Sequence, residues 1–201
     1  PNGQVLVAGG AQRDPLQAFD SAELYTPGGS WTLLTNKMKT VRYAHTATLL
    51  PSGEVLVVGG TNGTTPTNQV EVFNPTNLTW TAKAAMTTAR HLHTATLLPS
   101  GKVLIAGGLG ANGQPTNSAK LYDPASSTWS DAGPLVNGRA RHVAALLSCG
   151  KVIVAGGLGT TGDLASTETY TQKDPLITLA PTTLANGVVG QMFMQQFSIT
   201  G

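Results

Sequence analysis

Arginine and histidine recur together three times in this sequence, always in the order Arg-x-x-His. Imidazoles bind metal ions and guanidinium groups bind anions, so a ring of such side chains has the chemistry for either ligand. A polar residue that returns in every repeat is more often structural, because buried Arg and His side chains hydrogen-bond the backbone carbonyls around them. We therefore predict a structural role and no metal site for these six residues: Arg42, His45, Arg90, His93, Arg139 and His142.

The acidic residues and the single cysteine are not arranged as a catalytic group. Glu23, Glu71 and Glu168 share one repeat position, which Lys120 occupies in the third copy. This pattern predicts a solvent-facing strand position rather than a general acid–base pair. Cys149 replaces the serine of a Pro-Ser-Gly turn and has no His or Asp partner of its own, which argues against a nucleophile. The sequence thus predicts no catalytic residue and no cofactor, and this favours a protein that is not an enzyme.

The composition excludes several other classes of protein. With 40% hydrophobic and 11% charged residues, the 201-residue chain can bury a core. Its net charge of +2 comes from scattered basic residues, which argues against a nucleic-acid-binding surface. No apolar run approaches the roughly 18 residues that a membrane-spanning helix needs, so we predict no membrane span in this part of the protein. Any export signal would lie before Pro1.

The candidate residues belong to a repeat of about 49 residues. A Val-rich run that ends in two glycines marks each copy, at residues 5–10, 55–60, 103–108 and 152–157. Aromatic residues keep the same spacing: Tyr25, Phe73, Tyr122 and Tyr170, with Trp31, Trp80 and Trp129 after the first three. Such a period is typical of proteins built from stacked structural units.

Each copy predicts a small antiparallel sheet. In the second copy, turn residues separate four expected strands, at 46–50, 54–58, 69–73 and 79–83. The Val-rich strand is apolar on both faces, so both faces must be covered. Radial blades around a central channel meet this requirement, because each sheet packs between two neighbours.

These marks resemble the kelch repeat, in which a Gly pair ends the second strand and an aromatic residue and a Trp follow in the third and fourth. The resemblance covers residues 1 to about 171 and implies an all-β fold, a kelch-type β-propeller. We expect about three and a half four-stranded blades over residues 1–173. Propellers of this family usually have more blades, so we expect further sequence before Pro1. The six Arg and His residues would then lie at the channel mouth.

The last residues, 174–201, depart from the repeat. A Pro181-x-x-Leu184 segment before Gly187-x-x-Gly190 resembles the opening of a bacterial Ig-like domain. We therefore expect the start of an Ig-like β-sandwich here. The alternative is a closing or linker strand of the propeller itself.

The loops that follow the Gly pairs are the expected binding surface. They span residues 11–21, 61–68, 109–117 and 158–166, and differ most between the copies. Rigid scaffolds commonly present variable loops for binding, and the neutral polar side chains here suit a protein or glycan ligand. Ordinary solvated turns are the alternative interpretation. The candidate binding residues are Gln12, Arg13, Asn62, Thr64, Asn68, Asn112, Gln114, Asn117, Thr160 and Asp163.

The leading functional hypothesis is a non-enzymatic binding or adhesion module of bacterial type, secreted or at the cell surface. An enzymatic alternative follows from the similarity of a kelch propeller with an Ig-like domain to galactose oxidase and its copper-radical relatives. Here Tyr43 is displaced by one residue and Cys149 lies in a turn, so such a copper site would lie outside these residues. A third alternative is a subunit of an extracellular fibre, which self-associates through open blade edges.

Overall fold

The computed structural model describes residues 3–172, and this part of the chain is entirely β-structure and loops. Its strands form four antiparallel sheets of the repeat, which we call blades 1 to 4, and one separate hairpin. No helix in residues 3–172 has the length and apolar character needed to cross a membrane. The expected domain boundary at residues 173 and 174, and the Ig-like start at 174–201, lie outside the described residues.

Blades 2 and 3 are complete four-stranded sheets in which each strand pairs with the next in sequence. Blade 2 consists of β6 (Thr46–Leu49), β7 (Val55–Val58), β8 (Val70–Asn74) and β9 (Thr79–Lys83). Blade 3 consists of β10 (Thr94–Leu97), β11 (Val103–Ala106), β12 (Ala119–Asp123) and β13 (Thr128–Asp131). The strands expected in the second copy are thus found within one residue.

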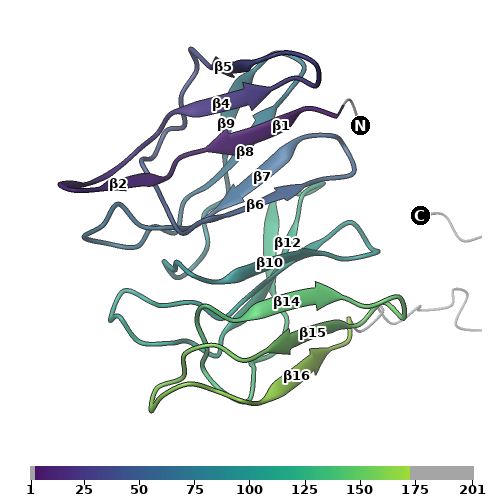
Figure 1. Cartoon of the computed structure of the whole chain (residues 1–201). Coiled ribbons are helices and arrows are strands. Elements are labelled where there is room, and N and C mark those ends of the chain that lie inside the picture. The colour runs from purple at the N-terminus through teal and green to yellow at the C-terminus, as the bar shows by residue number, and fades with distance from the viewer. Residues whose placement is uncertain (1–2, 173–201) are drawn as a thin grey trace, which may run out of the picture.

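Blades 1 and 4 have three strands each among the described residues. Blade 1 contains β1 (Val5–Ala8), β4 (Ala22–Tyr25) and β5 (Trp31–Leu33), and blade 4 contains β14 (Val143–Leu146), β15 (Val152–Ala155) and β16 (Thr167–Tyr170). The four sheets lie one after another, with β6, β10 and β14 on the same side of the stack (Figure 1). The all-β fold and the partial kelch-type propeller are confirmed.

The loop expected over residues 11–21 is more ordered than the sequence suggested. It contains a hairpin of β2 (Ala11–Arg13) and β3 (Leu16–Ala18), which extends away from blade 1 (Figure 1). Asp14 and Pro15 form its turn, and both are residue types that favour tight turns.

The hydrophobic core lies between the blades. Along β7 the buried residues alternate, so that Val57 packs with blade 1 while Leu56 and Val58 pack with blade 3. All three are fully buried, and each such side chain contributes about 1.5–3 kcal/mol of transfer free energy. In β11, Val103 likewise packs with blade 2, whereas Leu104 packs with blade 4. This two-sided burial explains why the Val-rich runs do not alternate with polar residues.

The aromatic residues of the repeat form cross-strand pairs that fill these interfaces. Phe73 and Trp80 stand opposite each other in blade 2, with ring centroids 5.0 Å apart, and both are buried against blade 1. Tyr122 and Trp129 repeat the pair in blade 3 at 4.9 Å. The Trp129 Nε1–H also donates to the carbonyl of Ala84, 2.8 Å away, and so links blade 3 to blade 2.

In blades 1 to 3, the first glycine of the Gly pair lies against the segment that leads into the next blade. Gly107 has a φ of +63°, and a Cβ placed on it would lie 2.4 Å from the carbonyl oxygen of Arg139. We expect Gly107→Ala to lower the free energy of unfolding by roughly 1–3 kcal/mol, through strain and displacement of that carbonyl. Urea unfolding measures the loss. Gly113→Ala is the matched control, because Gly113 has a φ of +71° but a Cβ placed there would meet no atom within 4 Å. An equal loss of stability in the two variants would contradict the steric explanation.

Candidate functional site

The three arginines of the Arg-x-x-His segments are buried inside the blades. Arg42 is completely buried, and its Nη1 donates to the carbonyls of Gly59 and Gln69 at 2.8 and 3.0 Å. These carbonyls lie just after β7 and just before β8, so the guanidinium holds together the two ends of the variable loop. Arg90 and Arg139 make the same two bonds in blades 3 and 4.

The expectation that the repeated glutamates face solvent is wrong for Glu71. Its side chain is 1% exposed and accepts a bond of 2.6 Å from Nη2 of Arg42. The backbone N–H groups of Lys39 and Thr40 donate to the same carboxylate, at 2.6 and 3.2 Å. These donors replace water, which is why the charge can be buried. Glu23 is exposed as expected.

Glu168 is held by the same arrangement in blade 4. It accepts from Nη2 of Arg139 at 2.6 Å and from the N–H groups of Val136 and Asn137 at 2.6 and 3.2 Å. Burial works against its charge, but the hydrogen bonds from Val136, Arg139 and Asn137 outweigh it and lower the pKa of Glu168. The signal in the sequence was the constant spacing of 29 residues between each arginine and its glutamate.

The histidines connect neighbouring blades. Nε2 of His93 lies 2.9 Å from the Thr46 hydroxyl of blade 2, and Nε2 of His142 lies 2.9 Å from the Thr94 hydroxyl of blade 3. Burial, with the nearby Arg90, lowers the pKa of His93 to about 3. Burial and the adjacent arginine likewise lower the pKa of His45 and of His142 to about 4. Neutral imidazoles therefore join the first strands of adjacent blades.

The groups relevant to copper chemistry are not brought together. Tyr43 lies beside Thr61 at the end of the blade that carries the variable loops, whereas Cys149 lies in the turn between β14 and β15 at the opposite end. Across residues 3–172, no group of three or more His, Cys, Asp or Glu side chains is placed to hold a metal ion.

The variable loops and the Arg-x-x-His segments lie together on one face, which we call the loop face. Isolated β-bridges join them, as between Tyr43 and Thr61 and between His91 and Leu109. Some predicted binding residues also make hydrogen bonds that support their own loops. The Asn62 carboxamide oxygen accepts from the N–H groups of Thr64 and Thr65, at 2.9 and 2.8 Å.

Two further predicted asparagines are engaged in similar ways. The Asn112 carboxamide oxygen accepts from the N–H of Gln114 at 3.1 Å. The Asn68 side chain donates to the carbonyl of Met86 at 2.9 Å. An Asn side chain that accepts from the N–H two residues later is a known turn type, so the sequence carried a signal for the roles of Asn62 and Asn112.

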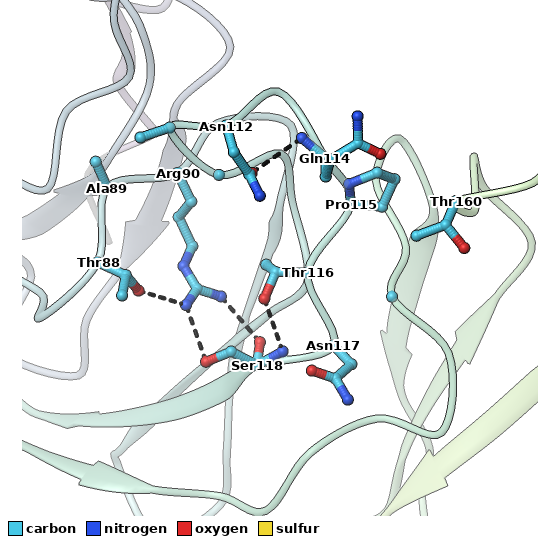
Figure 2. Close-up of a pocket in the computed structure, with 13 residues that line it drawn as sticks. Thr88, Ala89, Arg90, Asn112, Gln114, Pro115, Thr116, Asn117, Ser118 and Thr160 are labelled. Carbon is cyan, nitrogen blue, oxygen red and sulfur yellow. Dashed lines mark hydrogen bonds between the residues drawn. The ribbon is translucent and has the colours of Figure 1, made fainter.

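A cavity of about 670 Å³ opens on the loop face between blades 3 and 4. Four predicted residues line it: Asn112, Gln114, Asn117 and Thr160 (Figure 2). The other six lie outside it: Gln12, Arg13, Asn62, Thr64, Asn68 and Asp163. Sequence reasoning did not include the hydroxyls of Thr88 and Ser118, which line the cavity beside the Arg90 guanidinium.

A comparison with known families finds a match that covers all of the described residues. Residues 2–174 match the model of the KLHDC2/KLHL20/DRC7 Kelch-repeats domain. No curated protein matches the sequence.

Proposed function

Since the chain belongs to the kelch-repeat family, whose domains are generally protein-interaction modules, we propose that it is a non-enzymatic module that binds a protein on its loop face. The cavity between blades 3 and 4 is the observation that carries this proposal. Its volume of about 670 Å³ is in the range of binding sites for a small ligand or a few side chains of a partner.

The chemistry of the cavity suits an extended protein segment. Asn117 and Thr160 offer neutral donors and acceptors from two neighbouring blades, and Pro115 adds an apolar wall (Figure 2). The loops that carry them are anchored by the buried arginines beneath. A partner would thus bind to a surface that is already ordered, which reduces the entropic cost of association.

A selection of displayed peptides against the protein tests this proposal. We expect selected peptides to bind Thr160→Trp at least about tenfold more weakly than the wild type, because the indole fills the cavity. Thr64→Trp is the matched control, since Thr64 is also an exposed loop threonine but lies outside the cavity. Equal binding of the peptides to the wild type, Thr160→Trp and Thr64→Trp would refute a protein site at this cavity. So would a selection that yields no binding peptide while the wild type binds immobilised glycans.

We include an extracellular or cell-surface location and an adhesive role in the same proposal. Their support is the resemblance of residues 174–201 to an Ig-like domain, together with the polar loops. The copper-oxidase and fibre alternatives stay sequence-based hypotheses. Protease treatment of intact cells, together with a search for the protein in the culture medium, tests the location. A protein that is absent from the medium and is degraded only after cell lysis would contradict it.

A further inference from the structure

One of the three buried arginines has no carboxylate partner. Arg90 is as buried as Arg42 and Arg139, at 1% exposure, but Lys120 occupies the position that Glu71 and Glu168 hold in the neighbouring blades. In the described part of the chain, Arg90 forms no ion pair with an acidic side chain. Blade 3 therefore carries a buried positive charge that the repeat elsewhere neutralises.

Blades 2 and 4 show what this position normally binds. In blade 2, two backbone N–H groups and one arginine Nη2 converge on the Glu71 carboxylate. In blade 4, the same three donors converge on Glu168 at the same distances. The donor residues always lie three and two positions before the arginine. We call these two N–H groups and the guanidinium the carboxylate frame.

Blade 3 keeps the frame without the carboxylate. The equivalent N–H groups belong to Thr87 and Thr88, and neither donates to a protein acceptor within residues 3–172. Nη2 of Arg90 donates to the Ser118 hydroxyl, 3.0 Å away, as Nη2 of Arg139 does to Ser166. In place of a carboxylate it donates to the Thr88 hydroxyl, also 3.0 Å away (Figure 2). Burial lowers the pKa of Arg90 to about 10, with no carboxylate to oppose the effect.

Space is available where the glutamate side chain would lie. A cavity of about 170 Å³ is bounded by Thr87, Lys120 and Trp129 at the edge of blade 3. The Lys120 ammonium does not occupy the frame, because its Nζ forms an ion pair with Oδ1 of Asp131 at 2.5 Å. On the other side, the larger cavity of the loop face reaches Thr88 and Arg90.

We propose that the frame formed by Arg90, Thr87 and Thr88 is a binding site for a carboxylate that comes from outside the chain. Guanidinium and paired backbone N–H groups make strong, charge-assisted bonds to such an anion. The carboxylate chemistry follows from the repeats themselves. Its delivery by an acidic side chain of a bound protein rests on the proposed function.

The substitution Lys120→Glu supplies the frame with a carboxylate from the chain itself, as in blades 2 and 4. It removes a competing positive charge and restores the pattern of the neighbouring copies, so the variant is expected to fold. Lys120→Gln is the matched control, because it also removes the positive charge but adds no carboxylate. The frame of blade 2 is an internal control, since Glu71 already occupies it.

The experiment is a titration of the full chain with acetate at constant ionic strength, in which the backbone amide NMR signals are monitored. We expect saturable shifts at Thr87 and Thr88 and none at Lys39 and Thr40. The shifts should persist in Lys120→Gln and disappear in Lys120→Glu. Absence of saturable shifts in the wild type, or equal shifts in Lys120→Glu, would overturn the proposal.

A second titration identifies the source of the carboxylate. It uses an N-acetylated, C-amidated Gly-Glu-Gly peptide, whose only carboxylate is a side chain. A Kd at least about tenfold below that of acetate supports a protein ligand, whereas equal values support a free small carboxylate at the same site. If displayed peptides bind the loop face equally well in wild type and Lys120→Glu, and acetate does not bind, the proposed function holds and the carboxylate site fails.

Discussion

Replacement of Glu71 by glutamine is expected to lower the free energy of unfolding by about 3–5 kcal/mol, because it leaves the Arg42 guanidinium buried without its counter-charge. Arg42 is completely buried and Glu71 is 1% exposed, so water cannot solvate the remaining charge. Glutamine keeps the shape of the side chain and can still accept from the N–H of Lys39. The loss therefore reports the charge rather than a cavity.

Urea unfolding followed by tryptophan fluorescence measures this effect. Glu23→Gln is the control, because Glu23 holds the same repeat position in blade 1 but is exposed, and its substitution should change stability by less than about 0.5 kcal/mol. If Glu71→Gln is no more destabilising than Glu23→Gln, the buried pair contributes nothing and the interpretation of the carboxylate frame is wrong as well.

The elements of the fold could be predicted from the sequence because they depend on local signals. The turn at Pro51-Ser52-Gly53 separates β6 from β7, and the continuous apolar run of β7 shows that both of its faces are covered. Gly59, in the Gly pair that ends this run, lies at a close backbone approach, since a Cβ there would lie 2.5 Å from the carbonyl oxygen of Arg90. Turn chemistry and two-sided burial thus specify a blade before its neighbours are considered.

The candidate site could be predicted only in part, because it depends on contacts between distant segments. Three copies of one position held glutamate, which suggested a solvent-facing strand, but a shared position does not distinguish a hydrated charge from a paired one. Only the structure shows Glu71 paired inside the blade, and Arg90 buried without an acidic partner among residues 3–172. The cavity that gathers Asn112 and Thr160 likewise requires two adjacent blades.

Acidification from pH 7 to pH 4 is expected to destabilise the protein steeply, because two buried histidines, His93 and His142, and the half-buried His45 must stay neutral in the folded state. The pKa of His93 is lowered to about 3, and those of His45 and His142 to about 4, from an ordinary value of 6.5. Below pH 6.5 the unfolded chain therefore binds protons that the folded protein does not. Stability is fully present above pH 6.5 and is lost as the pH falls towards 4.

The slope of this loss approaches about 1.4 kcal/mol per pH unit for each histidine, or about 4 kcal/mol per unit for the three together. Glu168, whose pKa is lowered from 4.5, adds to the loss only at still lower pH. Urea midpoints at several pH values between 7 and 4.5 measure the slope. His93→Gln keeps a donor near the Thr46 hydroxyl but cannot titrate, so its slope should be about one third smaller than that of the wild type. A wild-type stability that stays constant from pH 7 to pH 5 would show that the histidines between the blades are not held neutral by burial.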